Sequence, residues 1–301
     1  MITLPAGLLM LYKITFSPYP LTGDPVSPHH DALNAIQAKS SGVAASCDHP
    51  ITINFHTDRR THDGMPLLLA MAKDGQLKSQ FETGTSNGGL TAFTGGERWR
   101  WEQRVFDGSY DHALPSQRPK YGALNVQALP YGASPRFGSA HFRLKAHVLA
   151  RTTFCYPDSF FEPEHFATHR HLAPLIDQLN SDDCDPLDAY IEAQIHGPLS
   201  LQQDVEALVL DPIYQGTEIE RQAQQLPVTL EWHQGFALSI EKMAQYPGYR
   251  GAQFIEIART IAREGLITAE ILSHAIHHLG HDPQDIKKVW HYLARFGYPQ
   301  P

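Results

Sequence analysis

The sequence predicts a mixed α/β domain followed by a smaller helical region. Several of its segments alternate apolar and polar side chains, as half-buried strands do. Residues 204–233 have the pattern strand, helix, strand, and three helical segments, each ended by a glycine, follow from residue 252. A hydrophobic content of 42% over 301 residues supplies enough apolar side chains for a sizeable core.

The N-terminal part begins without a regular pattern. Residues 17–30 are rich in proline and serine, so we expect an irregular lead-in there and a short helix from Asp31. ITINFH (51–56) alternates as a strand does, and residues 65–75 predict a helix that ends at Gly75.

Residues 79–160 are dense in glycine, aromatic residues and arginine, which predicts short strands and tight turns. One helix is expected within this segment, near Arg98–Phe106, and AYIEAQIHG (189–197) is expected as a later strand. The chain is thus expected to comprise a lead-in, an α/β domain and a C-terminal helical region, with boundaries at 1–49, 50–235 and 236–301.

Charge and cysteine content exclude several classes of protein. The chain has 24 Lys and Arg against 32 Asp and Glu, a net charge of −8, which argues against general binding to a phosphate backbone. Cys47, Cys155 and Cys184 are too few and too scattered for a disulfide framework or a structural zinc site.

No segment predicts attachment to a membrane. No window approaches 18 consecutive apolar residues, and the apolar start MITLPAGLLMLYKITF lacks the basic region and cleavage site of a signal peptide. We therefore expect a cytoplasmic protein, or one delivered to another cell as an effector, and we leave its oligomeric state open.

One short motif matches a known catalytic signature. GxGxxG, GxxxxGK[ST], HExxH and CxxC are absent, but GTSNG (84–88) matches GxSxG, in which Ser86 would be the nucleophile of a serine hydrolase. Gly95 and Gly96 stand where the helix of such an enzyme would run, so a glycine-rich turn without chemistry is the alternative.

Three separated segments contain side chains suited to one cleft. His56 ends the first strand and is followed by Arg59, and FETGTSNGG (81–89) carries hydroxyl groups in a glycine-rich turn. A carboxylate, an amide and an imidazole share one face of the later strand because side chains alternate there: Glu192, Gln194 and His196. Such groups are unusual in a core and are suited to lining a cleft.

Six segments resemble an uncharacterised family of bacterial and fungal domains of unknown function. In order, they are FHTDR, FETGTSNGG, RPKYGALN, PRFGS, TTFCYPDS and YIEAQIHGPLSL. The resemblance covers most of residues 50–297 and implies no established activity.

A second resemblance is to the mono-ADP-ribosyltransferases, toxin-like enzymes that cleave NAD. It rests on EAQIHG and the LSLQQDV that follows, and on YGALN and GSAHFRLK. This resemblance implies a split-sheet α/β core, NAD as the substrate and no metal. The family pattern is an arginine or histidine on the first core strand, a Ser-Thr-Ser-like segment and a glutamate on a later strand. The ADP-ribose acceptor, whether protein, nucleic acid or water, stays open, and so does the choice between transferase and glycohydrolase.

The resemblance assigns roles to particular positions of this chain. His56 or Arg59 would anchor NAD, and Thr85 and Ser86 would brace the glutamate. Glu192 would be catalytic. The second motif reads TGTSNG rather than Ser-Thr-Ser, and Gln194 stands where many members have a second glutamate, so either Glu192 or Gln194 could occupy the key position.

Physical chemistry supports these roles. Cleavage of the nicotinamide glycosidic bond creates an oxocarbenium-like ribose, which a carboxylate such as Glu192 stabilises. An arginine or histidine forms charge-assisted hydrogen bonds with a dinucleotide. Tyr121 could stack on the nicotinamide ring, and a position in the core is the alternative.

Histidines suggest a different class of site. The segment HAIHHLGH places four of them along one helix face: His274, His277, His278 and His281. Such a stripe could bind a metal in a hydrolase or nuclease, as could the pair His165 and His169, whereas a solvated helix face needs no ligand. A binding module without enzymatic activity on the same fold is the remaining alternative.

Overall fold

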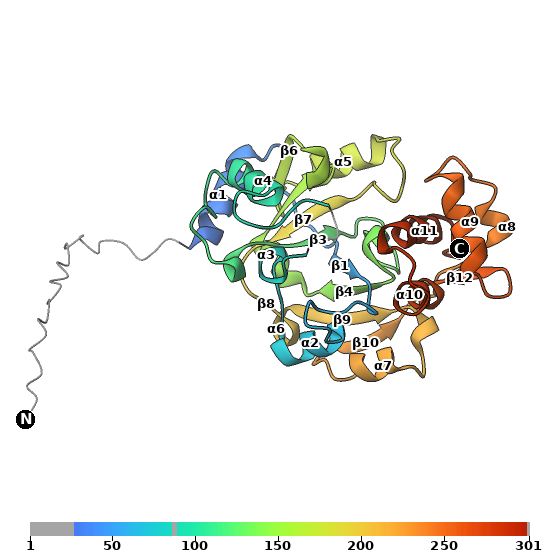
Figure 1. Ribbon diagram of the computed structural model, residues 1–301. Coiled ribbons are helices and arrows are strands. Elements are labelled where there is room, and N and C mark those ends of the chain that lie inside the picture. Colours follow the sequence, from blue (N-terminus) through green and yellow to red (C-terminus); the bar gives the residue numbers. More distant parts are fainter. Residues whose placement is uncertain (1–26, 86–88, 300–301) are drawn as a thin grey trace, which may run out of the picture.

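The computed structural model describes residues 27–85 and 89–299, and a sheet of eight strands forms its centre (Figure 1). The strand order is β10-β9-β4-β1-β3-β7-β5-β6. Neighbours are antiparallel except β9 and β10, which are parallel. The strands are β1 (Ile51–Phe55), β3 (Lys120–Leu124), β4 (Ala140–Leu144), β5 (Thr152–Tyr156), β6 (His165–Thr168), β7 (Ile191–Ile195), β9 (Val205–Leu210) and β10 (Thr229–Trp232).

Helices and short strands surround this sheet. Before the C-terminal region they are α1 (Pro28–Lys39), α2 (Leu67–Asp74), β2 (Gln76–Leu77), α3 (Gln80–Thr83), α4 (Glu97–Val105), α5 (Ala173–Ser181), β8 (Leu199–Ser200), α6 (Leu201–Asp204) and α7 (Glu218–Ala223). The 3-10 helices are η1 (Pro115–Gln117), η2 (Pro135–Phe137), η3 (Ala146–Arg151), η4 (Ser159–Phe161) and η5 (Pro212–Tyr214). None of the helices in residues 27–85 and 89–299 is long and apolar enough to cross a membrane.

The C-terminal region is mainly helical and lies at one end of the sheet (orange to red in Figure 1). Its elements are β11 (Ala237–Ser239), α8 (Ile240–Met243), α9 (Ala252–Ile261), β12 (Leu266–Thr268), α10 (Ala269–His277) and α11 (Pro283–Phe296). They share a hydrophobic cluster in which Trp290 and Phe236 are fully buried. The Trp290 indole also donates a hydrogen bond to the Pro135 carbonyl at 2.9 Å, which joins α11 to η2.

The α/β fold class with a C-terminal helical region is confirmed. β1, β7, α2, α4 and the three late helices occur where the sequence predicts them, and Gly75 ends α2 in the left-handed conformation. α1 is an exception, because it begins at Pro28 rather than Asp31; the fixed φ of proline suits the first turn of a helix. Eight strands form one continuous sheet, and β2 pairs with β8 and β11 with β12 in two separate sheets. The resemblance to an ADP-ribosyltransferase core stays a prediction, as do the domain boundaries.

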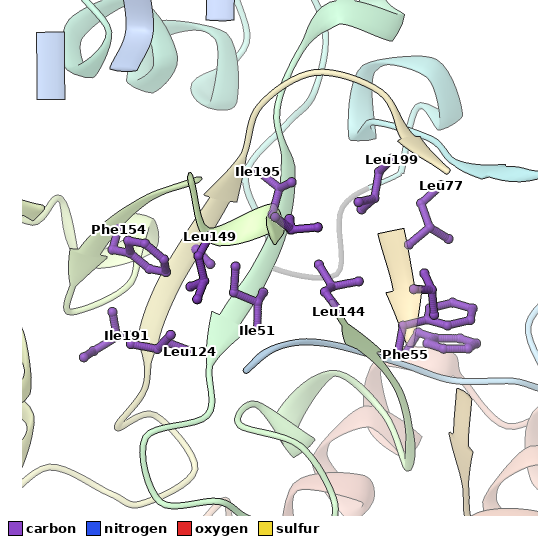
Figure 2. Close-up of a cluster of buried hydrophobic side chains, with 14 of the residues drawn as sticks. Ile51, Phe55, Leu77, Leu124, Leu144, Leu149, Phe154, Ile191, Ile195 and Leu199 are labelled. Atoms are coloured by element: carbon purple, nitrogen blue, oxygen red, sulfur yellow. The ribbon is translucent and has the colours of Figure 1, made fainter. Parts of the chain in front are cut away.

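The two faces of the sheet differ in chemistry because successive side chains point to opposite sides. Figure 2 shows one face, where Ile51, Leu124, Phe154 and Ile195 form a cluster of buried apolar side chains. Side chains of α2, α5 and α7 belong to the same cluster. The opposite face carries polar groups, and the candidate site lies there.

A close backbone approach after η2 gives a test of this architecture. Gly138 has φ 152°, and a Cβ on it would lie 2.0 Å from the carbonyl carbon of Phe55 in β1. We expect Gly138→Ala to lower the free energy of unfolding by more than about 2 kcal/mol in urea denaturation, because β1 and η2 must separate. The matched control Gly216→Ala, with φ 72° and no heavy atom of the described residues beyond its chain neighbours within 4 Å of the added Cβ, should cost about 1 kcal/mol. Equal losses for the two variants would contradict the close approach.

Candidate functional site

The carboxylate of Glu192 lies on the polar face of β7 with only 6% of the residue exposed. Its Oε2 accepts hydrogen bonds from the Ser159 hydroxyl at 2.7 Å and from the Ser159 backbone amide at 3.3 Å. Its Oε1 accepts a hydrogen bond at 3.0 Å from the side-chain amide of Gln194, two residues along the same strand face. Both carboxylate oxygens are therefore held in place by donors.

Arg98 provides the counter-charge of this carboxylate. It lies in the first turn of α4, is 3% exposed, and has its Nη1 4.0 Å from Glu192 Oε1. The same Nη1 donates to Ser159 Oγ at 2.7 Å, and that hydroxyl in turn donates to Glu192. The guanidinium carbon lies 4.0 Å from the ring centroid of Tyr121, so the cation is stacked on an aromatic face. Its Nε has no hydrogen-bond partner among residues 27–85 and 89–299.

A second ion pair lies beside the first. Glu102 of α4 is fully buried and accepts hydrogen bonds from Arg118 Nη1 at 2.5 Å and from the Tyr121 hydroxyl at 2.7 Å. Arg118 also donates to the backbone carbonyl of Tyr110 at 2.8 Å. Four buried charged groups, two of each sign, therefore lie between α4 and the sheet: Arg98, Glu102, Arg118 and Glu192.

His196 continues the polar face beyond β7, and neighbouring hydroxyl groups hold its ring in place. The Thr153 hydroxyl donates to Gln194 Oε1 at 3.0 Å and lies 2.9 Å from His196 Nε2, and the Tyr110 hydroxyl lies 2.7 Å from His196 Nδ1. These contacts are satisfied when Nε2 carries the proton and Nδ1 accepts from Tyr110. Burial lowers the pKa of His196 to about 3, so the ring is neutral and orients Thr153 and, through it, Gln194.

The surroundings of Glu192 shift the pKa of its carboxyl in both directions. Burial raises the pKa of its carboxyl above the usual value, and the charge of Asp158 acts in the same direction. The Arg98 charge and the hydrogen bonds from Ser159 and Gln194 oppose this rise. Titratable groups with shifted pKa values in a polar cluster are typical of functional sites.

His56 lies in a different environment from Glu192. Its ring packs edge-on against Trp290 of α11, with centroids 5.0 Å apart, in a small cavity between the end of β1 and the C-terminal helices. Asp58 and Arg59 line the same cavity, and Asp58 Oδ2 lies 3.5 Å from Nε2 of His277 in α10. Burial lowers the pKa of His56 to about 4. Neither predicted NAD anchor, His56 or Arg59, donates one of the hydrogen bonds to Glu192 described above.

Thr85 and Ser86 form the segment predicted to brace Glu192. Thr85 Oγ1 donates to Thr83 Oγ1 at 3.0 Å, and Ser86 lies outside the described residues. The hydroxyl that reaches Glu192 in the described part of the chain is that of Ser159 instead. Gly89 lies beside η4, since a Cβ at this position would be 3.9 Å from the ring of Phe160.

Two alternative sites receive no support from their local structure. The residues before Gly84 form helix α3, whereas the GxSxG nucleophile elbow requires a strand there. His274 and His278 have ring centroids 4.9 Å apart, and His165 begins strand β6. Within residues 27–85 and 89–299, no three or more His, Cys, Asp or Glu side chains form a group that could hold a metal ion.

A family model described as protein of unknown function (DUF3626) matches residues 50–179 and 164–295. The chain belongs to this family. The predicted resemblance to an uncharacterised family is thereby confirmed, and the resemblance to mono-ADP-ribosyltransferases stays a prediction. No curated protein matches the chain. The matched segments of this DUF3626 protein include every residue of the polar network around Glu192.

The raised pKa of Glu192 leads to a prediction about stability. Because this pKa is higher in the folded chain than in the unfolded chain, protonation stabilises the fold, and that contribution is lost as pH rises from 4.5 through the folded pKa. Glu192→Gln keeps a neutral side chain at every pH. The unfolding free energy of the variant minus that of the wild type should therefore rise as pH rises over that range. The change should be at most about 1.4 kcal/mol per pH unit in urea unfolding. Glu206→Gln, a 54% exposed side chain on β9, is the control and should alter stability by less than about 0.5 kcal/mol. A gap between wild type and Glu192→Gln that is constant with pH would contradict the prediction.

Proposed function

We propose that this protein cleaves the glycosidic bond between nicotinamide and ribose in NAD and passes the ADP-ribosyl group to an acceptor or to water. The observation that carries the proposal is the held carboxylate of Glu192, which has a serine hydroxyl on one oxygen and the Gln194 amide on the other. A carboxylate fixed in this way is suited to stabilise positive charge that develops on a sugar ring.

The proposed reaction needs an ionised glutamate. The bond between ribose C1′ and the nicotinamide nitrogen breaks, its electron pair leaves with nicotinamide, and the ribose becomes oxocarbenium-like. Glu192 then stabilises that cation until a nucleophile attacks C1′ and releases its proton to the solvent. Arg98 favours the ionised carboxylate, and the Ser159 hydroxyl, which links the two, fixes its orientation.

Gln194 sets a limit on how the acceptor is activated. Its amide donates to Glu192 and accepts from Thr153, so its hydrogen bonds orient the glutamate. An amide does not take up a proton at neutral pH, so a second carboxylate at this position, common in the ADP-ribosyltransferases, has no equivalent here. Glu192 is therefore the carboxylate of this strand face that acts on the ribose in the proposed reaction.

His56 and Arg59 keep their proposed role as NAD anchors on grounds of topology. β1 neighbours β3, and β3 neighbours β7, so one strand separates the strand before His56 from the strand of Glu192. Tyr121 lies on that intervening strand with its ring under Arg98, a packing position rather than a free stacking surface. The proposal therefore assigns the nicotinamide ring to the neighbourhood of Glu192 without a direct contact from Tyr121.

Replacement of the glutamate tests the proposal directly. We expect the wild type to release nicotinamide from NAD, measured by chromatography, and Glu192→Gln to reduce the rate by about 100-fold or more, because a neutral amide does not stabilise the cation. The exposed Glu206→Gln serves as the matched control and should retain wild-type activity. If the wild type releases no nicotinamide and NAD does not shift its melting temperature, the proposed function is wrong.

The hydroxyl of Ser159 has a separate, positioning effect. Ser159→Ala removes one hydrogen bond to the carboxylate, so we expect kcat for nicotinamide release to fall about tenfold with little change in KM. Circular dichroism should show the same fold as the wild type. An unchanged kcat would indicate that Ser159 has no part in orienting Glu192.

A further inference from the structure

A second cluster of charged groups lies where α11 meets the chain segments before β7 and before α9. Asp188 accepts hydrogen bonds from Arg136 of η2 and from Arg250, the latter at 3.4 Å. One carboxylate therefore holds two guanidinium groups side by side. The neighbouring Asp185 is engaged with Arg295 at 3.3 Å.

Three side chains of this cluster have buried nitrogen atoms without a hydrogen-bond partner in the described part of the chain. His291 of α11 is 1% exposed, and neither ring nitrogen has a hydrogen-bond partner in the described part of the chain. The Nε atoms of Arg136 and Arg250 are also buried and without partners there. Buried polar groups are nearly always hydrogen-bonded, so three such groups together indicate a place suited to an acceptor molecule.

The charge around His291 favours an anion. Four cationic side chains act on its ring, namely Arg250, Arg136, Lys288 and Lys287. Burial and these cations lower the pKa of His291 to about 2, so the imidazole is neutral and offers one N–H donor. This concentration of positive charge, with Asp188 between the two arginines, occurs in a chain whose net charge is −8.

We propose that Arg136, Arg250 and His291 form a binding site for a phosphate or diphosphate group. Guanidinium groups suit phosphate because their planar N–H donors match its oxygen atoms, and Asp188 orients both of them before the ligand arrives. The Nε edges of the arginines and the imidazole N–H are the donors left for the ligand.

The position of this site connects it to Glu192. Asp188 lies four residues before Glu192, and the Tyr190 hydroxyl between them donates to Asp158. Charges of both Glu192 and Arg136 act on the Tyr190 ring. The phosphate site rests on its own geometry; if the proposed function holds, the diphosphate of NAD would be its occupant, and otherwise a separate phosphorylated molecule would be.

Binding of inorganic pyrophosphate tests the site without reference to activity. In isothermal titration calorimetry of the full chain we expect saturable binding at one site. Arg250→Gln should weaken it about tenfold or more, because a charged donor is lost. Arg295→Gln is the matched control, since Arg295 pairs with Asp185 nearby and should leave the affinity within about twofold.

Two outcomes would overturn the site. One is the absence of saturable binding, and the other is equal weakening by Arg250→Gln and Arg295→Gln, which would indicate general electrostatic attraction. If Arg250→Gln does not fold, Arg136→Lys decides the matter, because it keeps the charge but removes the planar donors and should also weaken binding about tenfold.

Competition with NAD identifies the source of the phosphate. If the site holds the diphosphate of NAD, pyrophosphate should inhibit nicotinamide release competitively, and Arg250→Gln should raise KM for NAD with kcat within about twofold. If pyrophosphate binds without affecting nicotinamide release, the site serves a separate phosphorylated molecule. If pyrophosphate binds and NAD is not cleaved, the phosphate site stands and the proposed function fails.

Discussion

The structure depends on the balance of four charged groups that α4 and its neighbours keep out of water. Arg98, Glu102, Arg118 and Glu192 are each at most 6% exposed. Removing one member of a buried ion pair typically costs about 3–5 kcal/mol, because the partner remains charged and uncompensated. The two pairs are therefore interdependent, and Tyr121 joins them through its ring and its hydroxyl. This balance fixes where α4 lies on the sheet.

An apolar face at this position would stabilise the fold about as well as the polar face does. Replacing buried ion pairs by well-packed hydrophobic side chains is often neutral or stabilising. The opposite face of the same sheet shows what such packing looks like, with Ile51, Leu124 and Phe154 in one cluster (Figure 2). This face instead retains a carboxylate of raised pKa, held by a serine and an amide, and such perturbed groups are typical of functional sites.

Local sequence patterns were sufficient to predict individual strands, the residues that share a strand face and one helix end. Alternation located β1 and β7 and placed Glu192 and Gln194 on one face, and glycine marked the end of α2. Partners of these side chains were not predictable, because the contacts join distant residues: Arg98 meets Ser159 across 61 positions, and Trp290 meets Pro135 across 155. His56 shows the same limit, since its surroundings are set by α11, which a pattern near residue 56 does not encode.

Hydrogen bonds link the C-terminal helices to the chain segment before β7. The indole of Trp290 holds the backbone of η2, and the side chain of Arg136 in η2 holds Asp188 just before β7. A displacement of α11 would thus reach the strand that carries Glu192 through two hydrogen-bonded steps. α11 also supplies His291, so the proposed phosphate donors lie in the same region as this link. If an anion binds between α11 and η2, its binding free energy would stabilise this packing of α11 on η2, because a ligand that binds only the folded chain stabilises the fold.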